Sequence, residues 1–265
     1  MNTIRFTSCQ SPNAEPVLIE IARWLSEQLG QPIQFVNDIS WQERYAQLDA
    51  GEVDAAWICG LPYVTRADAA ASQIELLCAP VMQGDRYASK PIYFSDVVVR
   101  SDSAFQRFED LRGTRWAINE RGSHSGYNVV RWYLGNHGLS SEFFGSVIES
   151  GGHLLSLQLV LNGEVDAAAI DSTVLETELR SDPTLAQRIR VIEAMGPSPI
   201  PPYVVQKSLY DDDKRRLRQA FLTIHEDSRG RHILAKGGYE RFVAVTDADY
   251  DVTREMAQIA DTVTL

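Results

Sequence analysis

The segment Gly122–Tyr127 (Gly-Ser-His-Ser-Gly-Tyr) combines glycines with hydroxyl side chains between a predicted strand and a predicted helix. The N–H groups that begin a helix lack intrahelical acceptors, and the helix dipole is positive there, so such a segment attracts anions. Ser123 and Ser125 add hydroxyl donors that suit phosphate-like oxygens. The alternative is that Ser123 only caps the helix. The segment is neither a hydrolase nucleophile elbow, because His124 is its central residue, nor a P-loop.

Four further side chains are candidates for the same site. His153 follows Ser150-Gly151-Gly152 at a second strand-to-helix junction, where it either donates to a ligand or caps and packs. Asp171 ends a predicted strand, where it accepts from a ligand amine or a protonated ligand oxygen, or else caps the next helix. Tyr63 and Tyr93 either close over a ligand or pack in the core.

Catalytic and metal-binding patterns are not visible in this sequence. The histidines are scattered and lack the spacing of a zinc site. The cysteines Cys9, Cys59 and Cys78 have no metal or redox spacing, and an odd number argues against a disulfide framework. Cys9 and Cys59 each end a predicted strand, so they are either paired thiols near a ligand or small buried side chains. We expect no catalytic residues, no metal and no cofactor.

The hexapeptide Gly-Glu-Val-Asp-Ala-Ala occurs twice, at Gly51–Ala56 and at Gly163–Ala168. Each copy follows a helical pattern and leads into an apolar run, which predicts a helix, a tight glycine turn and a buried strand. A match of six common residues can arise by chance. If the copies correspond, the chain contains two similar α/β lobes with a ligand cleft.

The periodicity along the chain predicts strands that alternate with helices, which favours mostly parallel α/β sheets. The expected strands are Ile4–Ser8, Ile33–Val36, Val53–Ile58, Ile74–Val81, Tyr93–Val99, Arg115–Ile118, Val147–Glu149, Val165–Ile170, Ile189–Ile192 and Tyr203–Gln206. The expected helices are Glu15–Leu29, one from the Ser40 cap to Leu48, one from Pro62, Ser123–Leu134, His153–Leu161, Thr173–Leu179 and Asp211 to about Asp227. The proline-rich stretch 196–202 predicts an extended, stiff segment.

Composition limits the partners. The 265 residues have a formal net charge of −11, which disfavours binding to nucleic acid or to an anionic membrane. No stretch approaches the roughly 20 apolar residues of a membrane span. The start Met1–Phe6 lacks the features of a signal peptide. We therefore expect a cytoplasmic protein if the sequence is complete, or a periplasmic or cell-envelope protein if a signal was removed.

Several motifs together resemble the phosphonate and phosphate substrate-binding proteins of ABC importers, which have the type 2 periplasmic-binding fold. The matching motifs, in order, are Tyr93–Val99, Asp110–Gly113, Ser123–Tyr127, Gly152-His153 and Gly163–Asp171. The resemblance implies lobe 1 at residues 1–91 plus 203–265 and lobe 2 at 92–202. It also implies hinge crossings near 91–93 and 197–202, and closure of the lobes around a ligand in the cleft between them.

The resemblance also implies roles for individual residues. The serine segment and the following helix would hold phosphonate oxygens, and Tyr93, His153 and Asp171 match other binding positions. His124 replaces the usual Thr, which removes a hydroxyl and adds a pH-sensitive group. Since Ser123, His124, Ser125 and Gly126 form the core of the match, they are the first candidates for ligand contact.

The function implied is capture of a small phosphonate, phosphate or similar anion, with an ABC permease as the possible partner. One alternative is a cytoplasmic enzyme on the same fold, either a small-molecule lyase or a biosynthetic enzyme. Another is a ligand sensor for a signalling protein.

Overall fold

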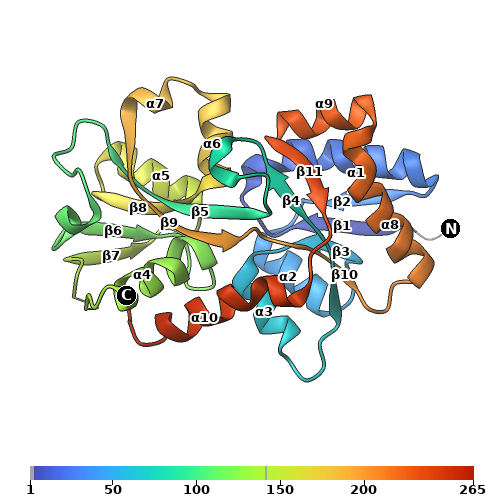
Figure 1. The fold of residues 1–265 in the computed structure, drawn as a ribbon, viewed down its shortest axis with the longest axis horizontal. Helices are drawn as coiled ribbons and strands as arrows, with labels where there is room; N and C mark the ends of the chain where they lie inside the picture. Colours follow the sequence, from blue (N-terminus) through green and yellow to red (C-terminus); the bar gives the residue numbers. More distant parts are fainter. Residues whose placement is uncertain (1–2, 141) are drawn as a thin grey trace. The chain divides into compact units, whose positions relative to one another are not determined.

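The computed structural model describes residues 3–140 and 142–265 and contains two β-sheets, each flanked by helices (Figure 1). Internal contacts divide the chain into two compact units. Unit 1 comprises the chain up to Ile92 and Pro199–Tyr250, and unit 2 comprises Tyr93–Ser198 and Asp251–Leu265. The predicted α/β fold class with two helix-flanked sheets is confirmed. The compartment was predicted from the start of the sequence, and its first residue, Met1, lies outside the described residues.

Unit 1 is built on a six-stranded sheet with the order β11-β4-β10-β3-β1-β2. Its strands are β1 (Ile4–Ser8), β2 (Ile33–Val36), β3 (Ala55–Trp57), β4 (Ile74–Met82), β10 (Tyr203–Gln206) and β11 (Tyr239–Val243). Its helices are α1 (Glu15–Leu29), α2 (Trp41–Asp49), α3 (Gly60–Ala67), α8 (Asp211–Thr223) and α9 (Ser228–Lys236). Strands β1, β2 and β3 are parallel, whereas β10 runs antiparallel to β3 and β4, so the sheet is more mixed than the sequence predicted.

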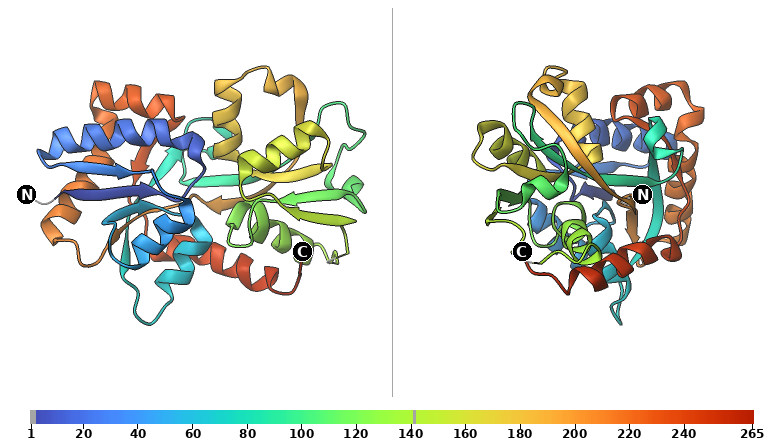
Figure 2. Two further views of the ribbon diagram at one scale, coloured as in Figure 1. Left: turned by 180° about the vertical axis from the view of Figure 1, so that it is seen from behind. Right: turned by 60° about the vertical axis from the view of Figure 1, so that its left-hand side comes forward.

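Local sequence explains the helices of unit 1. Helix α1 buries one apolar stripe that includes Ile21 and Leu25, and it ends where Gly30 takes a left-handed conformation (φ 59°). Helix α2 begins with the predicted capping box, in which the Ser40 hydroxyl accepts from the Glu43 N–H. Figure 2 shows helices covering both faces of each sheet.

Unit 2 is built on a five-stranded sheet with the order β7-β6-β8-β5-β9. Its strands are β5 (Ile92–Arg100), β6 (Arg115–Ile118), β7 (Ser146–Glu149), β8 (Ala167–Asp171) and β9 (Ile189–Pro199). Its helices are α4 (Val129–Asn136), α5 (His153–Asn162), α6 (Ser172–Ser181), α7 (Leu185–Arg188) and α10 (Asp251–Ala260). Strands β7, β6 and β8 are parallel, and β5 is antiparallel to β8.

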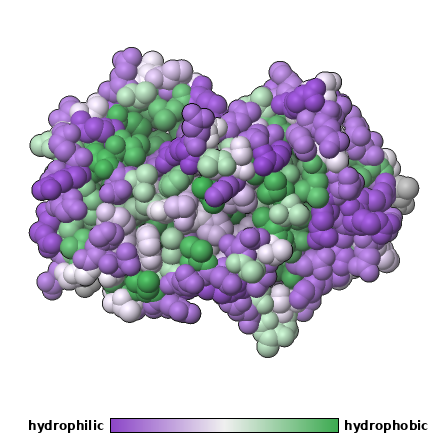
Figure 3. Space-filling view, viewed as in Figure 1, coloured by the Kyte–Doolittle hydropathy of each residue, from purple (hydrophilic) through white to green (hydrophobic). Residues whose placement is uncertain are grey.

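Alternation along the strands of unit 2 creates a separate core on each face of the sheet. Trp116 and Ala169 pack with residues of α4 and α10 on one face. Ala117 and Ala168 pack with residues of α5 and α6 on the other. Figure 3 shows hydrophilic side chains over much of one face, with hydrophobic patches between them.

The repeated hexapeptide has the same structure in both units. Gly51 and Gly163 both adopt left-handed φ angles, 72° and 70°, at or one residue past the C-cap of the preceding helix. Each copy then leads into a buried strand, as predicted. In each copy the aspartate carboxylate accepts the N–H of an arginine on the neighbouring strand, Asp54 from Arg5 at 2.7 Å and Asp166 from Arg115 at 2.8 Å.

The chain beyond residue 250 corrects the sequence-based division. We predicted that it completes lobe 1, but Asp251–Leu265 groups with unit 2. The reason is packing of α10 against α4: Met256 lies in the α4 core, and the Arg131 guanidinium donates to the Val263 carbonyl at 2.6 Å.

Strand β9 is longer than predicted, because it continues to Pro199 where we expected only Ile189–Ile192. It lies at the edge of its sheet, where a proline that lacks an N–H donor is tolerated.

Candidate functional site

The ends of three parallel strands in unit 2 bring the predicted site residues together. Strands β7, β6 and β8 lie side by side, so the segments that follow them emerge at one edge of the sheet. Ligands of open α/β sheets bind at this edge. The serine segment follows β6, His153 begins the helix after β7, and Asp171 ends β8.

The serine segment starts the helix after β6, but in an unusual form. Residues His124–Asn128 form a π-helix that runs directly into α4, and such elements are frequent at functional sites. The Ser123 hydroxyl accepts from the Gly126 N–H at 3.1 Å and from Asn119 Nδ2 at 2.9 Å. Ser123 therefore caps the helix, which was one of the two roles predicted for it. Because its oxygen accepts both bonds, its own hydroxyl proton is left for donation.

Gly126 is required by this packing. A Cβ atom on Gly126 would lie 2.0 Å from the Asn119 side-chain oxygen. The Asn119 side-chain amide thus packs directly against Gly126, and its nitrogen donates to the Ser123 hydroxyl. Sequence reasoning did not select Asn119, although its position directly after β6 was a signal.

Ser125 and His153 form the central contact of the site. The Ser125 hydroxyl lies 2.9 Å from His153 Nε2, and Asn119 Nδ2 lies 3.3 Å from the same nitrogen. Burial lowers the pKa of His153 to about 4, with a smaller opposite effect from the Ala169 carbonyl, which accepts from the ring. His153 is therefore neutral at physiological pH. Because the ring donates one N–H to the Ala169 carbonyl, Nε2 is left as an acceptor for either Ser125 or Asn119.

Asp171 has the capping role that we gave as its structural alternative. Its carboxylate accepts from the Thr173 N–H at 2.8 Å and from the Thr173 hydroxyl at 2.7 Å, which caps α6. Burial raises the pKa of Asp171 to about 6 despite these bonds. Its backbone N–H lies 3.4 Å from His153 Nδ1, so it borders the Ser125–His153 pair.

The His124 side chain points into the protein core. It is fully buried, its Nδ1 lies 3.1 Å from the Asn128 side-chain nitrogen, and its Nε2 lies 3.2 Å from the Ser198 hydroxyl. Burial lowers the pKa of His124 to about 4. The imidazole of His124 is therefore neutral at physiological pH, and its contact with Ser198 joins the serine segment to β9.

The two tyrosines lie in different units. Tyr93 is buried on β5, whose Ser95 pairs with Asp171 across the sheet. Tyr63 belongs to unit 1, where its hydroxyl donates to Asp247 at 2.7 Å and its ring packs on Tyr250. Within unit 1 Tyr63 is thus packed in the core, which was one of the two roles predicted for it. Its contact with a ligand stays a prediction.

Glu120 is a second residue that sequence reasoning did not select. Its backbone carbonyl accepts from the Ser123 N–H at 3.2 Å. Its carboxylate oxygens lie 3.9 Å from the position that a Cβ on Gly122 would occupy. Burial, and then the nearby Glu149 carboxylate, raise the pKa of Glu120 to about 7.

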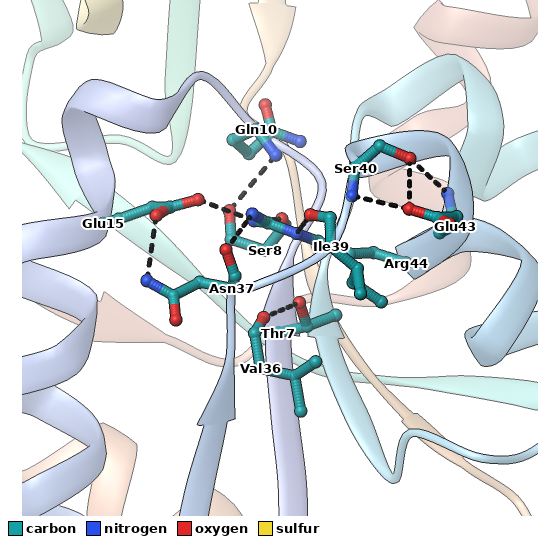
Figure 4. Close-up of polar contacts among 10 residues, drawn as sticks. All are labelled: Thr7, Ser8, Gln10, Glu15, Val36, Asn37, Ile39, Ser40, Glu43 and Arg44. Carbon is teal, nitrogen blue, oxygen red and sulfur yellow. Dashed lines mark hydrogen bonds and ion pairs between the residues drawn. The ribbon is translucent and has the colours of Figure 1, made fainter.

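In unit 1, Arg44 organises the corresponding strand ends (Figure 4). This buried guanidinium donates to the carbonyls of Ser8, Asn37 and Ile39 at 2.8–3.0 Å and pairs with Glu15 at 2.7 Å. Its charge is therefore used to hold the segments that follow β1 and β2.

Cys9 and Cys59 follow β1 and β3 in the same unit. Both are partly buried thiols that form no disulfide, and the Cys59 N–H donates to the Tyr45 hydroxyl at 3.3 Å. Among residues 3–140 and 142–265 no group of three metal-ligating side chains is placed to hold a metal ion. No helix in the same part of the chain is long and apolar enough to cross a membrane.

The two helix-flanked sheets and the strand-end site together define a class of two-sheet α/β proteins. Solved structures share this fold at low sequence identity. A binding protein component of an ABC phosphonate transporter from Pseudomonas aeruginosa aligns with a TM-score of 0.85, at 20% identity over 98% of this chain and 86% of that one. PhnD1 from Prochlorococcus marinus, in complex with methylphosphonate, aligns with a TM-score of 0.80, at 18% identity over 98% of this chain and 99% of that one.

Sequence comparison identifies the family. The family described as the periplasmic phosphonate substrate-binding protein of ABC transporters matches residues 6–250, and the chain belongs to it. The phosphonates-binding periplasmic protein of Escherichia coli is 25% identical over 211 residues, which are 78% of this chain. The match spans 60% of the length of that relative.

Proposed function

We propose that this protein captures a small phosphonate or phosphate-like oxyanion for an ABC importer and performs no chemistry on it. Membership in the family supports this function, and the observation that carries it is the Ser125–His153 contact. That contact lies where three parallel strands end and a helix begins, in the arrangement expected for anion recognition.

His153 positions the Ser125 hydroxyl for the anion. In the structure described above, Ser125 and Asn119 both approach His153 Nε2, which accepts only one strong hydrogen bond. When Ser125 turns its proton to an anion oxygen, Asn119 remains as the donor to the ring. The exchange leaves no buried nitrogen unpaired, so the ligand gains a charge-assisted bond at little cost.

The surroundings of the serine segment favour strong binding per contact. Residues 123–128 are all buried, so a ligand held by them would be removed from water. Hydrogen bonds to an ionised oxyanion are strengthened in such surroundings. We propose the Ser123 and Ser125 hydroxyls and the N–H groups of the π-helix start as donors.

The partner and the compartment follow from the same proposal. An importer of this type requires a permease, so we propose an ABC permease as the partner and the periplasm or cell envelope as the compartment. An enzyme or a sensor on this fold finds no specific support in the site.

Calorimetric titration tests the proposed function. We expect methylphosphonate, 2-aminoethylphosphonate, phosphite or phosphate to bind with a dissociation constant far below the millimolar range. Acetate serves as the control anion with a different shape. Failure of all four to bind at millimolar concentration would reject the function.

A further inference from the structure

We propose that the serine segment selects singly charged oxyanions, such as protonated phosphonates and phosphonate monoesters, and that Glu120 sets this preference. The inference rests on the proposed function, because it assumes that the serine segment holds the anion. It then asks which charge state of the anion the surrounding residues tolerate.

The donors of the segment carry no positive charge. Ser123, Ser125 and Asn119 are neutral, and burial keeps His153 neutral above a pKa of about 4. These groups stabilise an anion by dipoles alone. A second negative charge on the ligand therefore gains less than it would beside an arginine or a lysine.

The cations nearest to the segment in sequence are already engaged. Arg121, which is 60% exposed, lies 3.7 Å from the Glu149 carboxylate and donates to the Tyr127 hydroxyl at 3.2 Å. Arg131 donates to the Val263 carbonyl at 2.6 Å, and its guanidinium lies 4.8 Å from the centre of the Tyr127 ring. Neither guanidinium is available to neutralise a dianion without losing these partners.

Carboxylates, in contrast, border the segment on two sides. The Glu120 carboxylate lies over Gly122, at the start of the segment, and Glu149 approaches it from the end of β7. Asp171 approaches from the end of β8, beside His153. A charge at Glu120 or Asp171 repels a bound dianion about twice as strongly as a monoanion, because the Coulomb energy is proportional to each charge.

Glu120 changes its charge more than Asp171 does between pH 6 and pH 8.5. The pKa of Asp171, which caps α6 through Thr173, is raised only to about 6, so this carboxylate is already about half ionised at pH 6. Burial and the nearby Glu149 carboxylate, which lies 3.7 Å from the Arg121 guanidinium, raise the pKa of Glu120 to about 7. Glu120 is therefore mostly protonated at pH 6 and mostly ionised at pH 8.5. A phosphonate loses its second proton in the same range, so both changes oppose binding at the higher pH.

Methylphosphonate titrated by calorimetry at pH 6 and pH 8.5 tests this inference. We expect the affinity of the wild-type protein to fall by about tenfold or more at the higher pH, about 1.4 kcal/mol. In Glu120→Gln the fall in affinity between pH 6 and pH 8.5 should be about threefold or less. In Glu149→Gln this fall should also be smaller than in the wild-type protein. Glu164→Gln is the matched control, because this exposed glutamate precedes β8 at the opposite edge of the sheet.

Two results would overturn the inference while the proposed function stands. One is wild-type affinity that is equal or higher at pH 8.5. The other is the same fall in Glu120→Gln as in the wild-type protein. Absence of binding of methylphosphonate at both pH values, together with no binding of 2-aminoethylphosphonate, phosphite or phosphate, would instead reject the proposed function and the inference with it. Circular dichroism of each variant shows that a changed affinity does not reflect unfolding.

Discussion

Replacement of Ser125 by alanine is the sharpest perturbation of the site. The Ser125 hydroxyl contacts only His153 Nε2 among the side-chain bonds described, and Asn119 Nδ2 lies near enough to replace it. Folding should therefore lose little, about 1 kcal/mol or less, which is the net value of one neutral hydrogen bond. Ligand binding should lose more, because the same hydroxyl would donate to a charged oxygen.

The expected loss of affinity can be worked from that bond. A hydrogen bond to a charged group contributes about 1.5–3 kcal/mol. Its loss should raise the dissociation constant about tenfold to hundredfold. Calorimetry with methylphosphonate measures the affinity, and denaturant unfolding measures the stability of the same sample. Ser101→Ala is the matched control, because the Ser101 hydroxyl bonds to the Gln187 carbonyl in the same unit, away from the site. Unchanged affinity in Ser125→Ala would refute the assignment of this hydroxyl to the ligand.

Two further predictions concern the supporting structure. Burial lowers the pKa of His124 to about 4, so stability from its neutral form is present above pH 6.5 and lost as pH falls toward 4. Between pH 8 and pH 5 the wild-type protein loses about 2 kcal/mol of stability in this way. We therefore expect urea unfolding to show that His124→Gln destabilises the protein by about 2 kcal/mol less at pH 5 than at pH 8. The destabilisation caused by His232→Gln, at an exposed histidine, should not change between these pH values. A Cβ atom on Gly126 would collide with the Asn119 side-chain oxygen. We therefore expect Gly126→Ala to lower the melting temperature by several degrees and to abolish anion binding. Gly152→Ala is the control, because a Cβ atom there would have no neighbour within 4 Å, and it should preserve the melting temperature. An unshifted melting temperature in Gly126→Ala would contradict the packing argument.

Much of the fold could be predicted because local sequence determines it. The repeated hexapeptide indicated a glycine turn and a buried strand in each unit. Glycine adopts a left-handed conformation without steric cost and commonly ends helices, and the short apolar run that follows it is typical of a buried strand. The capping box at Ser40 was equally local. In contrast, the placement of residues 251–265 depends on packing between α10 and α4, which lie more than a hundred residues apart in the chain.

The candidate site could be predicted only in part for the same reason. The serine segment and His153 were recognised because they follow predicted strands. Asn119 and Glu120 were missed because an amide or a carboxylate in a loop has no distinctive pattern, and their importance lies in what they contact. The burial of His124 could not be predicted either, because its partner Ser198 is distant in sequence.

The central claim is that the serine segment of unit 2 holds an oxyanion. A crystal structure of the protein with methylphosphonate tests this claim most directly. We expect the phosphonate oxygens within about 3 Å of the Ser125 hydroxyl and of N–H groups at the start of the π-helix. A phosphonate bound elsewhere, with Ser125 still bonded to His153, would contradict the account.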